Sequence, residues 1–115
     1  MRVLSVLLLG GVLAVSLARN TPAQTSTGSI RGYVTDSSGT PIAGARVIAV
    51  NVSTSAQREV ATQNNGFYTI VGLVPGEYDV TAHQIAMATQ KAHVRVSIAE
   101  VFPLDFKLGR SALQL

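Results

Sequence analysis

Apolar and polar side chains alternate in short runs between residues 28 and 108. In the first run, Ile30 and Val34 fall on one face, whereas Arg31 and Tyr33 fall on the other. Successive side chains of a β-strand point to opposite faces, so this period of two indicates half-buried strands. No stretch of this region shows the period of an amphipathic helix. The alternation predicts seven strands, at residues 29–35, 44–52, 58–63, 67–71, 77–83, 94–98 and 102–108.

Turn-forming residues separate the predicted strands. The clearest are residues 36–41, Asn64-Asn65-Gly66 and Val74-Pro75-Gly76. Asn and Gly accept left-handed backbone conformations, and Pro lacks an amide donor. Pro103 removes a donor from the last run, which places that strand at a sheet edge. We therefore predict an all-β fold, a seven-stranded antiparallel β-sandwich.

Apolar residues on the inward faces of these strands are the expected core. Tyr78 is a large member of this set, and its hydroxyl needs a hydrogen-bond partner if the ring is buried. The set comprises Ala45, Val47, Tyr68, Ile70, Leu73, Tyr78, Val80, Val94, Val96, Ile98, Phe102, Leu104, Phe106 and Leu108.

The first 23 residues have the parts of a secretory signal peptide. Met1-Arg2 gives a positive start, residues 3–17 form an apolar run, and small residues precede Gln24. This run falls short of the roughly 20 residues that cross a bilayer, so we expect no membrane span in the mature chain. Cleavage after Ala18 instead of Ala23, or a retained anchor, are the alternatives. We expect an exported protein, periplasmic, outer-membrane associated or secreted, organised as a signal peptide (1–23), a polar lead-in (24–27), one domain (28–108) and a tail (109–115).

Removal of this leader changes the charge balance. The whole chain carries nine Lys and Arg against six Asp and Glu, a net charge of +3, and Arg2 and Arg19 belong to the leader. The seven that remain against six acids provide no electrostatic footprint for nucleic acid or anionic lipid. The chain has no Cys, which excludes disulfides, thiolate metal ligands and a cysteine nucleophile.

The sequence contains no recognisable catalytic or metal-binding constellation. His83 and His93 lack further ligands at a metal-binding spacing. Ser, His and Asp residues are present, but no nucleophile elbow brings them together. Lys91 and Lys107 are expected to point outward, where they cannot form a buried isopeptide bond. We expect no enzymatic activity, no cofactor and no metal.

Two clusters of residues carry a resemblance to a known family. Residues 28–47 contain GSIRGYVTD and GTPIAGARV, and residues 62–78 contain TQNNGFYTI and PGEY. The chain resembles a carboxypeptidase regulatory-like domain over most of residues 28–108. The resemblance implies a transthyretin-like (prealbumin-like) sandwich, which is grouped with carbohydrate-binding-like folds. One departure is Ala86-Met87, in the loop 84–90, where the family usually has Gly followed by an aromatic residue.

With its leader, the chain is most similar to the N-terminal domain of Oar-type TonB-dependent outer-membrane receptors. This similarity implies a non-catalytic structural or interaction module, with an outer-membrane barrel or another protein contacted through an edge strand as the possible partner. The alternative is a carbohydrate-binding module. Tyr33 and Phe67, the aromatic residues expected to point outward, are its candidate ligand contacts. Asn51-Val52-Ser53 also matches the acceptor tripeptide for N-glycosylation.

Overall fold

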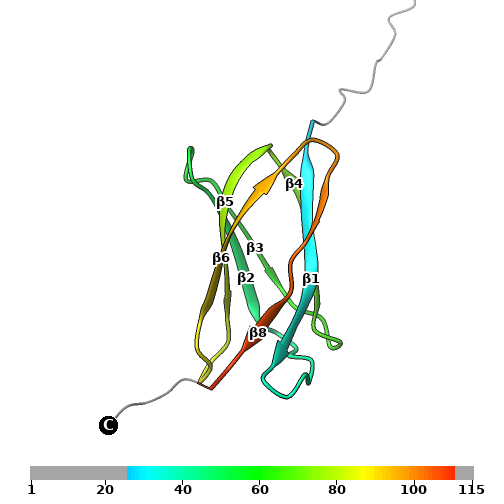
Figure 1. Cartoon of the computed structure of the whole chain (residues 1–115), viewed down its shortest axis with the longest axis vertical. Helices are drawn as coiled ribbons and strands as arrows, with labels where there is room; N and C mark the ends of the chain where they lie inside the picture. Colours follow the sequence, from blue (N-terminus) through cyan, green and yellow to red (C-terminus); the bar gives the residue numbers. More distant parts are fainter. Residues whose placement is uncertain (1–25, 111–115) are drawn as a thin grey trace, which may run out of the picture.

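The structure is a computed structural model that describes residues 26–110. The predicted signal peptide and the end of the predicted tail lie outside the described residues. Within the described part the chain is all β, and no helix there is long and apolar enough to cross a membrane. Its strands are β1 (Gly28–Asp36), β2 (Arg46–Asn51), β3 (Gln57–Ala61), β4 (Phe67–Leu73), β5 (Gly76–His83), β6 (Gln90–Val96), β7 (Val101–Pro103) and β8 (Phe106–Leu108) (Figure 1).

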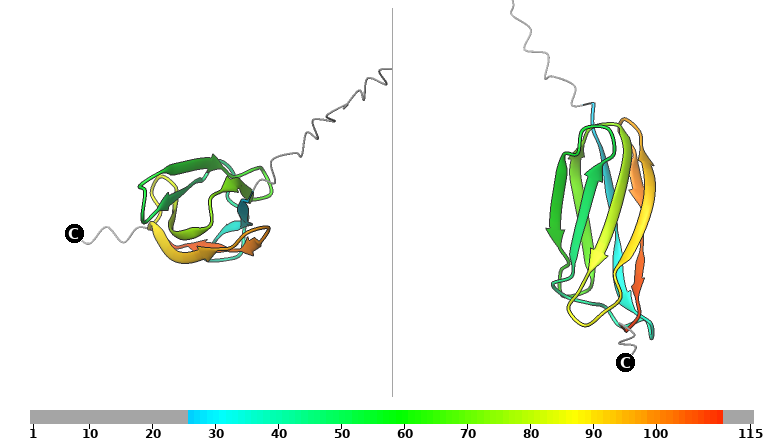
Figure 2. Two further views of the ribbon diagram at one scale, coloured as in Figure 1. Left: turned by 90° about the horizontal axis from the view of Figure 1, so that it is seen from above. Right: turned by 90° about the vertical axis from the view of Figure 1, so that its left-hand side faces the viewer.

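These strands form two four-stranded sheets that pack face to face, as Figure 2 shows from two sides. The first, here called the β2 sheet, has the order β3-β2-β5-β6, and every neighbouring pair is antiparallel. In the second, the β1 sheet, β1 pairs with antiparallel β4 on one side and with β7 and β8 on the other. The predicted all-β sandwich is confirmed.

The end of the domain differs from the predicted single antiparallel strand at residues 102–108. It forms two strands of three residues, β7 and β8, and both run parallel to β1. The direction follows from the connection, because residues 97–100 carry the chain from β6 to the end of the sandwich where β1 begins. There the Ser29 amide donates to the Glu100 carbonyl at 2.9 Å. Pro103 lies in β7, on the side of β1 opposite β4, in agreement with its predicted edge position.

The interruption between β7 and β8 has a steric basis at Gly32. A Cβ atom on Gly32 would lie 1.8 Å from the carbonyl oxygen of Leu104. This carbonyl accepts a hydrogen bond from the Tyr68 hydroxyl, and the Leu104 amide donates to the Arg31 carbonyl at 2.9 Å. Burial, and secondly the Asp105 charge, raise the pKa of Tyr68, so its hydroxyl remains a donor. Only glycine fits at position 32 without moving this junction.

The core between the two sheets consists mainly of the predicted residues. Tyr78 is 3% exposed, and its hydroxyl donates to the Val74 carbonyl at 2.6 Å. Ile98 is the exception: β6 ends at Val96, and Ile98 lies 62% exposed in the following loop. The buried apolar set comprises Ile30, Val34, Ile42, Ala45, Val47, Ala49, Tyr68, Ile70, Leu73, Tyr78, Val80, Ala82, Val94, Val96, Phe106 and Leu108. Phe102 and Leu104 are only partly buried against it.

The loop between β5 and β6 spans residues 84–89. Ala86 has a φ of 65°, a left-handed conformation that favours glycine. Met87 packs against the core and forms an isolated bridge with Arg110. Ala86 and Met87 therefore occupy a left-handed turn position followed by a core contact, which are roles suited to the Gly and aromatic residue they replace.

Candidate functional site

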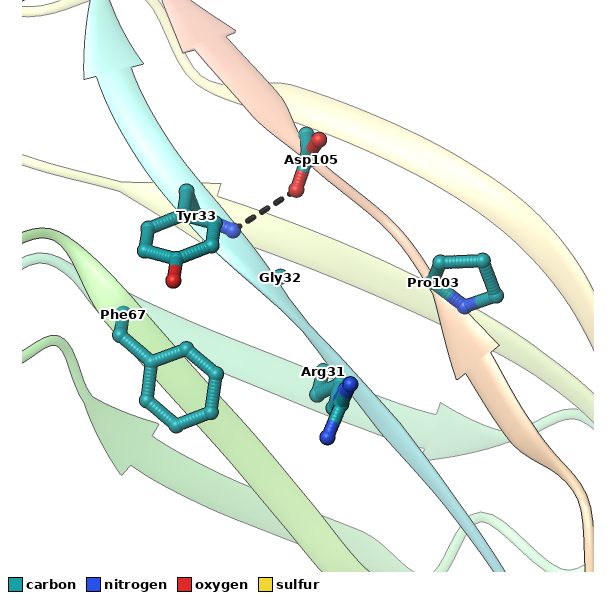
Figure 3. Close-up of a pocket in the computed structure, with 6 residues that line it drawn as sticks. All are labelled: Arg31, Gly32, Tyr33, Phe67, Pro103 and Asp105. Atoms are coloured by element: carbon teal, nitrogen blue, oxygen red, sulfur yellow. Dashed lines mark hydrogen bonds between the residues drawn. The ribbon is translucent and has the colours of Figure 1, made fainter.

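An open groove of about 360 Å³ lies on the outer face of the β1 sheet (Figure 3). Three consecutive residues of β1, Arg31, Gly32 and Tyr33, line its length. Phe67 of β4 lies on one side, and Pro103 and Asp105, from β7 and the segment before β8, lie on the other. Three separate parts of the chain therefore contribute to the groove.

Tyr33 and Phe67 form an aromatic pair on one side of this groove. They are opposite each other in the β1–β4 ladder, with ring centroids 5.5 Å apart and an interplanar angle of 61°. Tyr33 is 48% exposed, whereas Phe67 is partly buried. Such cross-strand pairs stabilise a sheet by themselves. The predicted outward orientation holds in the structure, and contact with a ligand stays a prediction.

Asp105 fixes the opposite side of the groove to β1. The Tyr33 amide donates to Asp105 Oδ1 at 2.8 Å. This carboxylate oxygen supplies an acceptor for β1 where the β7 and β8 ladders are interrupted. The alternation predicts only that Asp105 lies on the wet face of the last strand, and its proximity to Tyr33 depends on a register that local alternation does not encode.

Arg31 lies at one end of the groove, with Asp105 towards the other (Figure 3). Its side chain is exposed and forms no hydrogen bond or ion pair with any other described residue. The guanidinium of Arg46, on the β2 sheet, is by contrast paired with Glu59. Arg31 is therefore available to a ligand, a feature that the sequence alone does not distinguish from the other outward arginines.

His83 and His93, for which the sequence predicts no metal site, have different partners in the structure. His93 Nδ1 lies 2.9 Å from Asp79 Oδ1, and its Nε2 lies 3.6 Å from Glu77 Oε2. The hydrogen bond with Asp79 is the main cause that raises the pKa of His93 and lowers the pKa of Asp79. His83 instead contacts the Thr89 hydroxyl at 3.1 Å. Across residues 26–110, no group of three or more His, Cys, Asp or Glu side chains is arranged to hold a metal ion.

Asn51, the acceptor residue of the glycosylation tripeptide, has a structural role in the turn after β2. Asn51 is 5% exposed, and its Oδ1 accepts hydrogen bonds from the amides of Ser53 and Thr54 at 2.9 and 3.0 Å. These bonds close the turn after β2. The side chain that a glycan would need is therefore buried in the folded domain.

The exposed sheet edges differ in how well they could accept a partner strand. β4 carries a bulge beside Gly72, whose φ is 71°, and β7 contains a proline. β6 presents Lys91, His93 and Arg95. Bulges, prolines and charges all disfavour pairing with another chain. β3 has neither a bulge nor a proline, and its two exposed charges, Arg58 and Glu59, are of opposite sign, so it is the edge best suited to the predicted contact.

The fold and groove define a small transthyretin-like β-sandwich domain. The chain belongs to the carboxypeptidase regulatory-like domain family, whose sequence model matches residues 29–109. It is 37% identical over 90 residues to Structural protein 27 of a virus (isolate Australia/Victoria), covering 78% of this chain and 16% of the viral protein.

Solved structures share the fold at low identity. The Bacillus anthracis TIE protein matches with a TM-score of 0.63 and 20% identity, over 74% of this chain and 17% of that one. GBS52, a minor pilin of Streptococcus agalactiae, matches with a TM-score of 0.60 and 15% identity, over 78% and 47%. The 3-chlorocatechol 1,2-dioxygenase of Rhodococcus opacus 1CP is also similar, at 11% identity and a TM-score of 0.58, over 74% and 60%. These likenesses show the fold alone.

The chain is short beside its relatives. It spans about a sixth of the length of the viral structural protein, since it covers 16% of it.

Proposed function

We propose that this chain is an exported, non-catalytic structural module that works within a larger assembly. The observation that carries the proposal is the match to a viral structural protein, 37% identical over 90 residues. A match of this length is as long as the sandwich domain. The similarity therefore concerns the folded unit itself and not a short motif within it.

The arrangement of polar groups supports the same function. Each buried side-chain nitrogen or oxygen in the described part has a hydrogen-bond partner. Titratable groups with a perturbed pKa are candidates for catalysis, so the buried tyrosines are the interior groups to consider. Both donate to backbone carbonyls, Tyr68 to Leu104 at the β7–β8 junction and Tyr78 to Val74. The interior chemistry serves the fold.

Within such an assembly, the N-terminal module of a TonB-dependent receptor is our more specific proposal, with the outer-membrane barrel as the partner. It is supported by the resemblance over most of residues 28–108, including the ending at residues 94–108, and by the apolar leader-like run at residues 3–17. We propose β3 as the contact edge, because it has neither the bulge of β4 nor the proline of β7. Its exposed charges, Arg58 and Glu59, are of opposite sign, whereas β6 presents three basic side chains.

Site-specific photo-crosslinking in the native host tests this function. A crosslinking residue replaces Arg58 on β3 in one variant and Lys91 on β6 in a matched control. We expect the tagged chain in the envelope or the medium, with a discrete crosslinked partner from position 58 and none from position 91. Recovery as an uncrosslinked monomer in the cytosol would contradict both export and assembly.

The second candidate function is carbohydrate binding, which the groove favours. The structure brings Arg31 and Asp105 beside the Tyr33–Phe67 pair. Sugar sites combine an aromatic surface with nearby planar polar groups, and this groove contains both. We expect saturable retention on a polysaccharide gel that Tyr33→Ala or Phe67→Ala abolishes while unfolding remains cooperative. Equal retention of wild type and both variants would contradict a groove site.

A further inference from the structure

We propose that the groove binds an acidic saccharide, and that Arg31 holds a carboxylate of that ligand. The inference rests on the second candidate function and adds the ligand class. It follows from the combination of an unpaired guanidinium on β1, an aromatic wall from β1 and β4, and a carboxylate from the segment before β8, all of which line one groove (Figure 3). A uronic acid residue has the matching groups, namely a carboxylate, a C–H face and several hydroxyls.

Arg31 is the anion contact in this arrangement. It is exposed and unpaired within the described residues, and it lines the groove on the same face of β1 as Tyr33. A guanidinium presents a planar fork of donors that matches a carboxylate in a bidentate manner. Among the groove residues it carries the one positive charge. A ligand carboxylate would therefore be directed to this end of the groove.

The aromatic pair provides the surface for the sugar ring. Tyr33 and Phe67 meet edge to face, so their faces point in different directions, and Tyr33 remains 48% exposed. Pro103 forms part of the opposite wall. The volume of about 360 Å³ lies at the small end of the range for ligand sites, which suits one or two sugar rings.

Asp105 places a negative charge at the end of the groove opposite Arg31, so the two ends differ in charge. Its Oδ1 accepts the Tyr33 amide, and no described residue bonds to its Oδ2, which is left to accept a ligand hydroxyl. The same charge repels a ligand carboxylate. Because Arg31 and Asp105 lie towards opposite ends of the groove, the acid of the ligand is expected beside Arg31 and its hydroxyls beside Asp105.

The near-neutral charge of the chain makes this selectivity testable. Without residues 1–23 the chain carries seven basic and six acidic side chains, so polyanions in general are not attracted. The probes are oligomers of galacturonate, mannuronate and glucuronate-containing hyaluronan, the methyl esters of the same oligomers, and poly-glutamate. Binding is measured by calorimetry and by amide shifts of Tyr33 and Phe67, using the exported chain.

We expect at least one uronate oligomer to bind roughly tenfold or more tightly than its methyl ester. Arg31→Gln should remove this preference, Arg31→Lys should retain part of it, and Arg95→Gln on the β2 sheet should leave it unchanged. Equal binding of acid and ester would overturn the role of Arg31 while leaving saccharide binding intact. If poly-glutamate binds as tightly as the uronate oligomers, the groove recognises only the negative charge, and the proposed saccharide class is wrong. If no oligomer binds, both the inference and the second candidate function are wrong.

Discussion

The two sheets of this domain have the same number of strands and very different regularity. The β2 sheet is antiparallel throughout, with continuous registers between β2, β3, β5 and β6. The β1 sheet mixes parallel and antiparallel pairs, has a bulge against β4, and has an interruption between β7 and β8. The groove lies on this irregular sheet. Irregular pairing leaves backbone groups for side chains to satisfy, and such places are where proteins position exposed functional groups.

The side-chain chemistry of the two outer faces differs in the same way. On the β2 sheet, charged side chains pair with each other, as in Arg46–Glu59 and His93–Asp79. On the β1 sheet, Asp105 bonds to a backbone amide and Arg31 bonds to no described residue. Ion pairs therefore engage most of the charged side chains on the β2 face, with Arg95 as an exception. The β1 face retains groups that a ligand could use.

The largest expected effect concerns the regular half of the core. Tyr78→Ala removes the ring of a residue that is 3% exposed and should lower the free energy of unfolding by about 3 to 5 kcal/mol. Tyr78→Phe keeps the ring and loses only the hydrogen bond to Val74, at a cost of about 1 kcal/mol. Denaturant midpoints measure both. A loss below about 1 kcal/mol for the alanine variant would contradict the packing role of this ring.

Gly32→Ala tests the irregular sheet. The added Cβ would meet backbone, 1.8 Å from the Leu104 carbonyl oxygen, so the β7–β8 junction must shift. We expect a loss of about 1 to 3 kcal/mol in unfolding free energy, as for overpacked sites, together with faster hydrogen exchange of the Leu104 amide. Gly109→Ala is the matched control, because a Cβ atom on Gly109 would have no other atom within 4 Å. Equal stability of the two variants would show that the close approach at Gly32 does not determine the interruption.

The sequence predicts the regular sheet better than the irregular one, for a physical reason. Alternation encodes which face of a strand is buried, so it assigns residues such as Val47 and Val80 to the core correctly. Alternation does not encode direction or partner. The parallel pairing of β7 and β8 with β1 depends on where the 97–100 connection delivers the chain, and the split depends on Gly32.

For the candidate site too, alternation predicts which side chains point outward but not which of them come together. Alternation places Tyr33 and Phe67 outward, as the structure has them. Their pairing depends on the β1–β4 register, and the approach of Asp105 depends on the β7–β8 junction. Both are long-range features that hydrophobic periodicity does not carry. Alternation assigns Arg31 to a solvated face, and only the assembled groove distinguishes it from Arg46.

Ala86→Gly is expected to stabilise the domain slightly. Ala86 has a φ of 65°, and a left-handed conformation costs a non-glycine residue roughly 1 to 2 kcal/mol. Glycine removes this cost but adds roughly 0.4 to 1 kcal/mol of unfolded-state entropy, so the net gain should be about 0.5 to 1 kcal/mol. Ala92→Gly, within β6, should destabilise by about as much. Thermal unfolding of the two variants compares them, and a destabilising Ala86→Gly would contradict the strain.

The smallest expected effect is the pH dependence of the ion pairs on the β2 sheet. His93 faces Asp79 and Glu77, and Lys91 also lies 3.7 Å from Asp79. Because the pKa of His93 is raised by folding, its contribution is complete below its unfolded value of about 6.5 and is lost as the pH rises through the higher folded value. The pKa of Asp79 is lowered, so its contribution is present above about 3.8 and is lost only under acid conditions. The denaturant midpoint should therefore fall as the pH rises from about 6.5 through the raised pKa of His93, in wild type and in His83→Gln. The His93→Gln variant should show a smaller fall. An identical pH profile in His93→Gln and wild type would show that this exposed cluster does not contribute to stability.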